Sequence, residues 1–327
     1  MSKMKMVPTK LIVAVLLALG THGVVNAKTW YVTTKPGKNA GTGTKSDPFT
    51  NLAYAFNDKA ANGDTILLTA GTHLSNACEN FYAEKSNITI GPVPDAKVIF
   101  DCSKQSMTKN YGGINISSKA SNVTIHDIEV INDLTLADDQ RGVNNPIGIG
   151  IVVGGKGHVI RNCTVHSTWK AGIRVVSGAK DVSIVDCKVY DANTQNRNST
   201  GDIFSPKGLP IGIQIAGIDI FNADKVTTTG NEVWNVYGEG LLLNKSRNIT
   251  IANNVIHDVF STSIYCDNGQ SAKIYGNKIY SEKNEKFYRM KSPAVGIGIS
   301  NENMNGEGTK DIEVYDNDIS DARICLF

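Results

Sequence analysis

Along most of the chain, apolar and polar residues alternate with a period of two, in short runs rich in isoleucine and valine. Alternation of this kind predicts β-strands that turn one face toward a core. One phrase recurs, and its clearest copy is "NITIANNVIHDV" at 248–259. Each copy holds two apolar runs that are separated by a short polar turn. Further copies occupy 122–133, 181–192, 225–236, 272–283 and 311–322.

The spacing of these copies indicates the fold class. Asn231, Asn254 and Asn277 lie 23 residues apart, while other coils have a spacing of 24 or carry insertions. A fixed period of this length is typical of a solenoid, and the leucine pattern of leucine-rich repeats is missing. A second apolar phrase, G-I-x-[IVLC], also occurs once per coil. It occupies 148–153, 172–177, 212–217, 240–245, 263–268 and 296–301.

The repeat predicts an all-β protein, a right-handed parallel β-helix with 23–24 residues in its basic coil. Inward residues of one coil would stack on the same residues of the next, with strands about 4.8 Å apart. Asn231, Asn254, Asn277 and Asn317 would form a ladder in one turn, so we assign them no chemistry.

The two ends of the predicted solenoid differ. An open end exposes unpaired backbone groups and requires a cap. Residues 28–75 predict a strand and a capping helix that begins at Thr50 or Asn51. Residues 76–327 predict the coils, and no capping helix follows the final "ARICLF". We therefore expect a missing segment or a partner molecule to cover the C-terminal edge.

Residues 1–27 have the pattern of a secretory signal peptide. Three lysines precede the apolar run "LIVAVLLALG", and "VVNA" ends on small residues. The apolar run is too short for an ordinary membrane span. We expect cleavage after Ala27 and a secreted or periplasmic protein that is not embedded in a membrane. The alternative is an N-terminal anchor that is retained.

The net charge and the cysteine positions limit the class of partner and the pairing of the cysteines. Removal of the three lysines in residues 1–27 changes the formal charge from +2 to –1, which does not suit a nucleic-acid partner. The cysteine spacings match neither paired zinc motifs nor a dense disulfide framework. Cys163 and Cys187 share one repeat position, which predicts a disulfide or a buried thiol pair. Cys78 and Cys102 have the same spacing and could pair likewise.

Two segments resemble a known superfamily. "TWYVTTKPGKNAGTGTKSDPFTNLAYAFNDKAANGDTILLTAGTH" (29–73) and "ITIGPVPDAKVIFDCS" (88–103) resemble the opening of secreted, pectate-lyase-like β-helix proteins. The resemblance implies the fold, but its members include lyases, epimerases, hydrolases, tailspikes and sugar-binding proteins, so it does not imply one activity. Resemblance to the calcium-dependent lyases would imply a "DDGxD"-like aspartate cluster, and this chain has none.

Three insertions indicate where a site would lie. Residues 133–147, 193–211 and 283–295 all follow the second inward strand and precede the G-I strand. They would therefore project from one edge of the β-helix and wall a groove that suits a linear polymer. The alternative is an edge that simply tolerates insertion.

Outward residues beside this groove provide the catalytic candidates, which are Arg174, Tyr265, Glu239 and Asp267. A lyase needs a base to remove the proton beside a uronate carboxyl and a cation to stabilise the resulting charge. Glu239 is expected to lie close to Asn244 and Asp267. Glu239 and Asp267 are therefore the predicted ligands of a possible Ca²⁺ ion, or the carboxyl pair of a glycosidase.

The substrate-binding candidates are Lys170, Gln214, Asn244, His257 and Trp234. Trp234 and His257 belong to an outward aromatic column that could stack on sugar rings, or that could be an ordinary exterior sheet. The leading hypothesis is β-elimination on an acidic polysaccharide. The alternatives are a non-catalytic carbohydrate-binding or surface-assembly module and a glycoside hydrolase.

Overall fold

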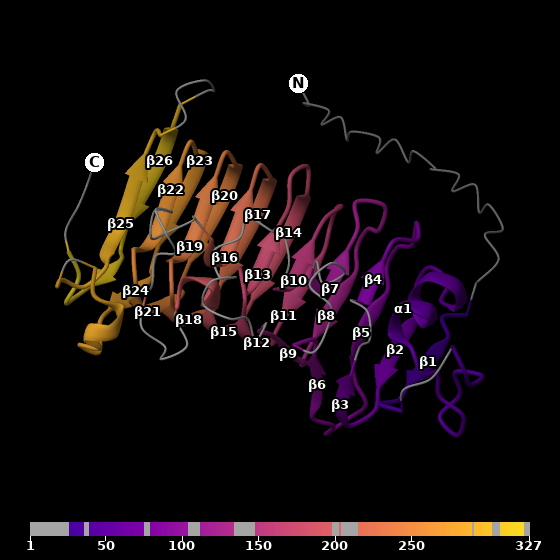
Figure 1. Ribbon diagram of the computed structural model, residues 1–327. Helices are drawn as coiled ribbons and strands as arrows, with labels where there is room; N and C mark the ends of the chain where they lie inside the picture. The colour runs from indigo at the N-terminus through magenta and orange to yellow at the C-terminus, as the bar shows by residue number, and fades with distance from the viewer. Residues whose placement is uncertain are drawn as a thin grey trace, which may run out of the picture.

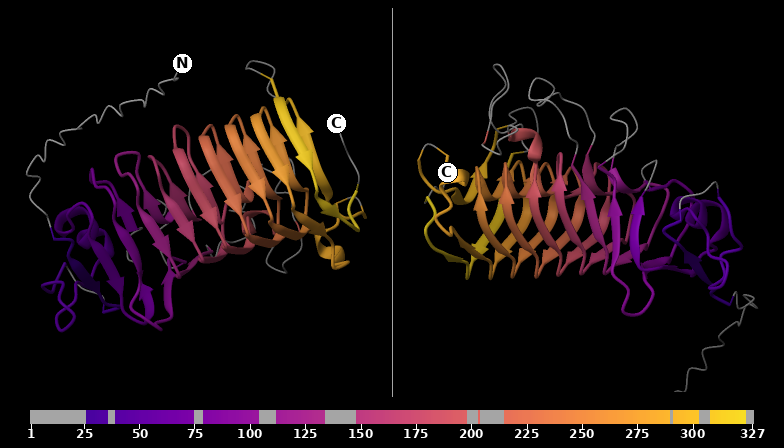
Figure 2. Two further views of the ribbon diagram at one scale, coloured as in Figure 1. Left: turned by 180° about the vertical axis from the view of Figure 1, so that it is seen from behind. Right: turned by 60° about the horizontal axis from the view of Figure 1, so that its bottom comes forward.

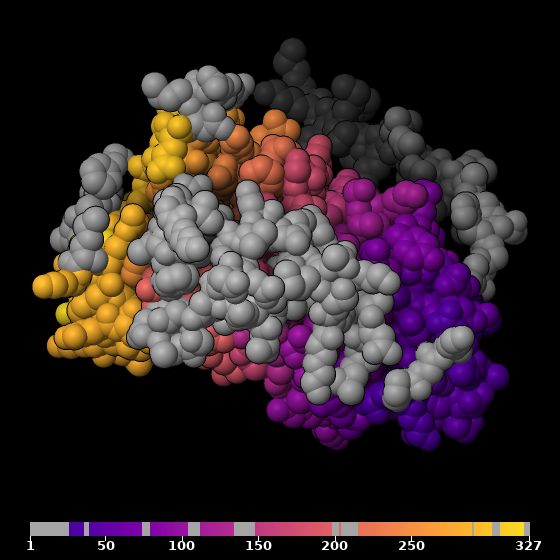
Figure 3. All heavy atoms as spheres, in the orientation of Figure 1, coloured from indigo at the N-terminus to yellow at the C-terminus, as the bar shows by residue number. Residues whose placement is uncertain are grey.

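The computed structural model describes residues 26–35, 39–74, 79–103, 112–133, 148–197, 203, 215–289, 291–302 and 308–323. These residues wind into an elongated parallel β-helix, with the first coils at one end and the last at the other (Figure 1; Figure 3). Their strands form three sheets, here named A, B and C, in which strands of successive coils lie side by side (Figure 2). The predicted fold class is confirmed.

In each of the three sheets the strands follow the order of the coils, because each coil adds a strand next to that of the preceding coil. Sheet A contains β1 (Thr29–Val32), β2 (Thr65–Leu68), β5 (Thr89–Pro92), β8 (Thr124–His126), β11 (Val159–Arg161), β14 (Lys180–Val185), β17 (Asp224–Thr229), β20 (Arg247–Ala252), β23 (Gln270–Tyr275) and β26 (Lys310–Tyr315). Sheet B contains β3 (Gly71–Leu74), β6 (Val98–Asp101), β9 (Glu129–Asn132), β12 (Thr164–Thr168), β15 (Lys188–Ala192), β18 (Glu232–Val236), β21 (Val255–Val259), β24 (Lys278–Tyr280) and β27 (Asp318–Ile319). Sheet C contains β4 (Glu79–Phe81), β7 (Gly112–Ile116), β10 (Ile149–Val153), β13 (Ile173–Val175), β16 (Ala216–Phe221), β19 (Glu239–Asn244), β22 (Thr262–Asp267) and β25 (Val295–Ser300).

The core runs through the middle of the coils and is built from columns of like side chains. Val165, Val189 and Val233 are register partners in adjacent coils, and all three are fully buried. Each buried aliphatic side chain of this size contributes roughly 1.5–3 kcal/mol. The predicted inward positions of the repeated phrase are confirmed.

The predicted asparagine ladder is present in the turn between sheets A and B. The amide Nδ2 of Asn254 donates to Oδ1 of Asn277 at 3.0 Å, and Asn231 donates to Asn254 at 2.9 Å. Asn277 continues the chain of bonds to Asn317 at 2.9 Å. Each Oδ1 also accepts a backbone N–H from the preceding coil, as Asn254 does from Asn231. The asparagines therefore satisfy buried backbone groups that the turn would leave without partners.

The glycine of the G-I phrase is required by close approach between coils. A Cβ at Gly150 would lie 2.5 Å from the carbonyl oxygen of Gly172, and one at Gly172 would lie 2.9 Å from that of Gly217. Contacts this short are not tolerated, so glycine is needed at these two positions, where strands of sheet C begin.

One strand of sheet C was predicted in the wrong place. Residues 212–217 were expected, but the strand is β16, five residues further on in its G-I phrase. The chain offers the phrase twice, as "GIQI" and then "GIDI". The second copy places Ile218 eight residues before Val226, which matches the eight residues from Leu241 to Ile249 in the next coil. Equal coil length therefore selects the second copy.

The N-terminal end has the expected cap. Helix α1 (Leu52–Tyr54) continues into a π-helical turn η1 (Ala55–Lys59). Asn51 is the N-cap, and its Oδ1 accepts the backbone N–H of Tyr54 at 2.8 Å. Phe56 is fully buried and stacks on Phe81 of β4 with ring centroids 4.4 Å apart. The cap thus joins the core directly.

At the other end, core positions are exposed in the last described coil. Val314 and Ile319 are 37 % and 41 % exposed, although their register partners Ile274 and Ile279 are buried. Among the described residues no further coil lies beyond β26 and β27. A segment or partner that covers this edge stays a prediction.

The predictions on the signal peptide, on membrane spans and on the cysteines remain to be compared with the structure. Residues 1–25, and with them most of the predicted signal peptide, lie outside the described residues. In the described part of the chain, no helix is long and apolar enough to cross a membrane. Cys163 and Cys187 are a buried thiol pair and not a disulfide. Cys78 lies outside the described residues, so its pairing with Cys102 is untested.

Candidate functional site

The outer face of sheet C carries most of the predicted site residues. Register places Arg174 on β13 beside Asp219 on β16, followed by Leu242 on β19 and Tyr265 on β22. Gln214, predicted at the position of Asp219, lies outside the described residues. So do 134–147 and most of 198–214, so the groove wall there stays a prediction. The third insertion is described except for residue 290 and contains the 3₁₀ helix η4 (Glu285–Phe287).

Arg174 and Asp219 form an ion pair across adjacent coils. Nε of Arg174 lies 3.1 Å from Oδ2 of Asp219, although the angle at Nε is not that of a hydrogen bond. The guanidinium also lies over the ring of Phe221, 5.6 Å from its centroid. Asp219 is only 3 % exposed. Burial raises the pKa of Asp219 to about 6, against the lowering effect of the Arg174 charge.

Lys170 precedes this strand by a short turn and is also buried. The turn is held by the backbone of Lys170, whose N–H donates to Gly148 at 3.1 Å and whose carbonyl accepts from Asn193 at 2.9 Å. Burial lowers the pKa of Lys170 to about 8, and the positive charge of Arg174 acts in the same direction. A lysine with this pKa is partly neutral under mildly alkaline conditions, which is the state required of a base.

Glu239 is the second buried carboxyl group of this face. It is 5 % exposed, and its Oε2 has no hydrogen-bond partner. Burial raises the pKa of Glu239 to about 7, while its own backbone N–H and the Ser261 hydroxyl oppose the rise. Nη1 of Arg289, from the third insertion, donates to the Ser261 hydroxyl at 3.1 Å. The carboxyl is therefore protonated in part near neutral pH.

The predicted pairing of Glu239 with Asp267 is wrong. Glu239 begins β19, whereas Asp267 ends β22 and pairs in register with Asn244 at the far end of β19. Five residues of strand separate the two ends, or about 16 Å. These two carboxylates cannot share a Ca²⁺ ion, whose ligands lie about 2.3–2.6 Å from it. They are also not a catalytic pair.

Tyr265 and Asp267 belong instead to a second cluster at that far end. The Tyr265 hydroxyl donates to Oε1 of Glu302 at 2.6 Å, and Oδ1 of Asp267 accepts the Glu302 backbone N–H at 2.9 Å. Burial and the Glu302 carboxylate raise the pKa of Tyr265 well above its ordinary value. Tyr265 is therefore not suited to act as a base. Asn244, the register partner of Asp267, has a buried Oδ1 without a hydrogen-bond partner.

The aromatic column on the outer face of sheet B is a stack of rings. His166 stacks on Tyr190 with centroids 4.6 Å apart, and Tyr190 stacks on Trp234 at 4.5 Å. Trp234 and His257 follow at 6.0 Å, and His257 and Tyr280 at 4.8 Å. Because neighbouring rings occupy both faces of Trp234 and His257, these faces are not open to a sugar. Of the two interpretations of this column, the stack favours an ordinary exterior sheet over stacking on sugar rings.

Sequence reasoning missed Asp219, Ser261 and Arg289. The signal for Asp219 was the equal length of neighbouring coils, which selects the second G-I phrase. Arg289 reaches Ser261 from an insertion whose path no repeat predicts, so the sequence held no comparable signal for it.

The fold and the repeat define the class, a right-handed parallel β-helix. The chain belongs to the Pel9A-like family, because the model described as "Pel9A-like, right handed beta helix region" matches residues 30–212, more than half of the chain. A search of curated protein sequences found no match.

Solved structures with the same fold are distant in sequence. An alginate lyase from Paenibacillus sp. str. FPU-7 is 11 % identical with a TM-score of 0.55, over 91 % of this chain and 97 % of that one. A GH136 lacto-N-biosidase from Eubacterium ramulus is 12 % identical with a TM-score of 0.55, over 89 % and 68 %. The A-module of a mannuronan C-5 epimerase from Azotobacter vinelandii is 14 % identical with a TM-score of 0.50, over 92 % and 89 %. At these identities the likeness shows the fold.

Proposed function

We propose that this protein acts on an acidic, uronate-containing polysaccharide by β-elimination on the outer face of sheet C. The observation that carries the proposal is the pair of cations Lys170 and Arg174, of which Lys170 has a pKa lowered to about 8. β-Elimination needs a base that is neutral near the working pH and a fixed positive charge. The two residues provide these properties on one face.

In this reaction neutral Lys170 removes the proton beside the uronate carboxyl and becomes an ammonium group. The electron pair of the broken C–H bond forms a C=C bond as the neighbouring C–O bond breaks. The departing sugar oxygen takes a proton from water, and the Lys170 ammonium group gives its proton to the resulting hydroxide. Arg174 balances the negative charge that develops on the carboxyl group. Asp219 holds the guanidinium from the next coil at 3.1 Å, which acts as a positioning contact.

The burial of the cluster sets a condition on this function. Lys170 is 4 % exposed and Asp219 is 3 % exposed, so the proposed reaction requires that these side chains become accessible to the polymer. Two proteins of similar fold act, by their names, on alginate and on mannuronan. Both substrates are uronate polymers, which supports the proposed substrate class. Export of the protein, which the pattern of residues 1–27 predicts, fits an extracellular polymer.

The test is an assay of the mature chain on pectate, alginate and glycosaminoglycans, followed by the ultraviolet absorbance of unsaturated products. We expect absorbance to rise on at least one polymer and to be lost in Lys170→Met. Lys188→Met, which removes an exposed lysine of sheet B, is the matched control and should retain the rate. Absence of unsaturated product on every polymer would exclude the lyase reaction.

Hydrolysis is the second candidate, and a specific observation favours it. Asp219 and Glu239 are two carboxyl groups of this face whose pKa values burial raises, to about 6 and about 7. A glycosidase requires one carboxyl group that stays protonated near neutral pH. New reducing ends without ultraviolet absorbance, lost in Glu239→Gln, would favour this reaction over elimination. If neither product forms while glycan binding is measurable, the protein is a binding module.

A further inference from the structure

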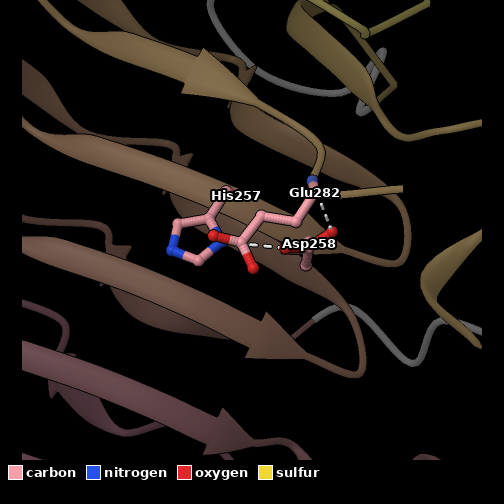
Figure 4. A group of neighbouring side chains, drawn as sticks. All are labelled: His257, Asp258 and Glu282. Atoms are coloured by element: carbon pink, nitrogen blue, oxygen red, sulfur yellow. Dashed lines mark hydrogen bonds and ion pairs between the residues drawn. The ribbon is translucent and has the colours of Figure 1, made fainter. Parts of the chain in front are cut away.

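Three potential metal ligands converge away from sheet C, where sheet B meets the third insertion. His257 and Asp258 lie near the end of β21, and Glu282 lies just after β24 of the next coil (Figure 4). One ligand atom from each residue lies within 4.8 Å of the other two. Ligands that share one divalent ion lie at such distances from one another.

The imidazole is fixed on both faces. The His257 ring lies between Trp234 and Tyr280, with interplanar angles of 4° and 8°. The stack holds the ring plane and leaves both nitrogens at the ring edge, where Nδ1 lies 2.9 Å from Oδ2 of Asp258. The role of this histidine in the ladder and a role as a metal ligand therefore use different parts of the ring.

The Asp258 carboxylate is oriented by three neighbours. Its Oδ2 lies 2.9 Å from Nδ1 of His257 (Figure 4). Its Oδ1 accepts from the Ser281 hydroxyl at 3.2 Å and from the Glu282 backbone N–H at 3.1 Å. Second contacts of this kind hold metal ligands in position. Asp258 and His257 are each 6 % exposed, so two of the three donors are both buried and held.

The local charge favours a cation. Two of the three potential ligands are carboxylates, and those of Asp258 and Glu282 lie within 4.8 Å of each other. In the described part of the chain, no lysine or arginine forms an ion pair with Asp258 or Glu282. Glu282 is exposed, which leaves a route for an ion from solvent.

We propose that His257, Asp258 and Glu282 bind a divalent transition-metal ion of the Zn²⁺ or Mn²⁺ type. One imidazole nitrogen with two carboxylates suits these ions, whereas Ca²⁺ prefers ligands that are all oxygen. Water would complete the coordination. The ion would fasten the start of the third insertion to the preceding coil, and with it the segment that carries Arg289 to Ser261.

The test is calorimetric titration of the full chain, freed of metal by a chelator, with Zn²⁺, Mn²⁺ and Ca²⁺. We expect one equivalent of Zn²⁺ or Mn²⁺ and weaker binding of Ca²⁺. Glu282→Gln should lower the affinity at least about tenfold. Glu285→Gln removes the same charge from an exposed residue of η4 and should leave the affinity unchanged.

A second measurement identifies the nitrogen donor. Cu²⁺ bound to the chain should show nitrogen hyperfine coupling in electron paramagnetic resonance, and His257→Phe, which preserves an aromatic ring in the stack, should abolish it. Circular dichroism of each variant checks the fold. No binding of Zn²⁺ or Mn²⁺, tighter binding of Ca²⁺, or equal losses in Glu282→Gln and Glu285→Gln would each overturn the site. None of these outcomes depends on whether the chain is a lyase.

Discussion

The outer faces of sheets B and C are built on the same repeat but differ in what the repeat carries. On sheet B, Tyr190, Trp234 and His257 are alike enough to stack, and each ring uses the faces of its neighbours. On sheet C the register column changes at each coil, from Arg174 to Asp219 to Leu242. These unlike side chains cannot stack into a ladder. Burial acts on each of them separately, and it raises the pKa of Asp219. Chemistry is therefore to be sought where neighbouring coils differ.

The largest expected effect concerns the base on sheet C. Lys170→Met retains a long side chain and removes a charge whose burial is unfavourable, so the fold should be preserved. If Lys170 is the base, the rate of elimination should fall by about 10²–10⁴-fold. The rate of unsaturated-product formation measures this, with Lys188→Met as control. Equal rates in the two variants would remove Lys170 from the mechanism.

The next effect concerns the ion pair. Arg174→Met leaves the Asp219 carboxylate buried without its partner, and breaking a buried pair costs about 3 kcal/mol or more. The loss should be greatest near pH 8 and smaller near pH 5, where Asp219 is protonated. Unfolding in urea at both pH values measures it.

The matched control for this pair is Arg247→Met, which breaks an exposed pair with Asp224 at 3.5 Å. Exposed pairs contribute about 0–1 kcal/mol, so this variant should change little. Arg174→Met combined with Asp219→Leu should recover stability. Equal losses in the two single variants would show that the sheet C pair is an ordinary surface contact.

A smaller effect is expected on sheet B. Trp234→Ala removes two ring contacts, each worth about 0.5–1.5 kcal/mol beyond the buried area, so the loss should be about 2 kcal/mol. Trp234→Phe should lose less because it preserves the stack. Unfolding measurements and the polysaccharide assay are made on the same samples. Loss of glycan turnover at unchanged stability would contradict the structural role of the ladder.

The smallest effect per variant is the pH dependence of stability. The folded-state pKa values of Asp219 and Glu239 are raised to about 6 and about 7, so the folded state binds more protons than the unfolded state above pH ~4. Their contribution to stability is therefore present at low pH and lost as pH rises to about 7. Each group contributes at most about 1.4 kcal/mol per pH unit. Glu239→Gln should flatten the upper part of this decline.

Lys170 acts in the opposite sense at higher pH. Its folded-state pKa is lowered from 10.5 to about 8, so between these values the unfolded state binds more protons and stability rises with pH. Lys170→Met should remove that rise. Urea unfolding of both variants across the pH range measures the two windows, and a flat profile in the unmodified chain would contradict the burial of these charges.

The sequence by itself determined which residues of a coil face the core and how successive coils stack. Its period, the inward valines and isoleucines, and Asn254 in its ladder were all predicted, and so was a helix cap at Thr50 or Asn51. Each of these depends on neighbouring residues or on the same position one coil away. A parallel β-helix stacks like on like, so a repeat in sequence becomes a contact in space.

Only the tertiary structure decided which unlike residues meet. Asp219 lies beside Arg174 because the length of neighbouring coils selected the second of two G-I phrases. Glu239 and Asp267 lie apart because they begin and end adjacent strands. Glu282 reaches His257 and Asp258 from the turn between β24 and the third insertion. A period defines the stacking of coils, but it gives no information on strand ends or on how an insertion folds, and these decide where the charges gather.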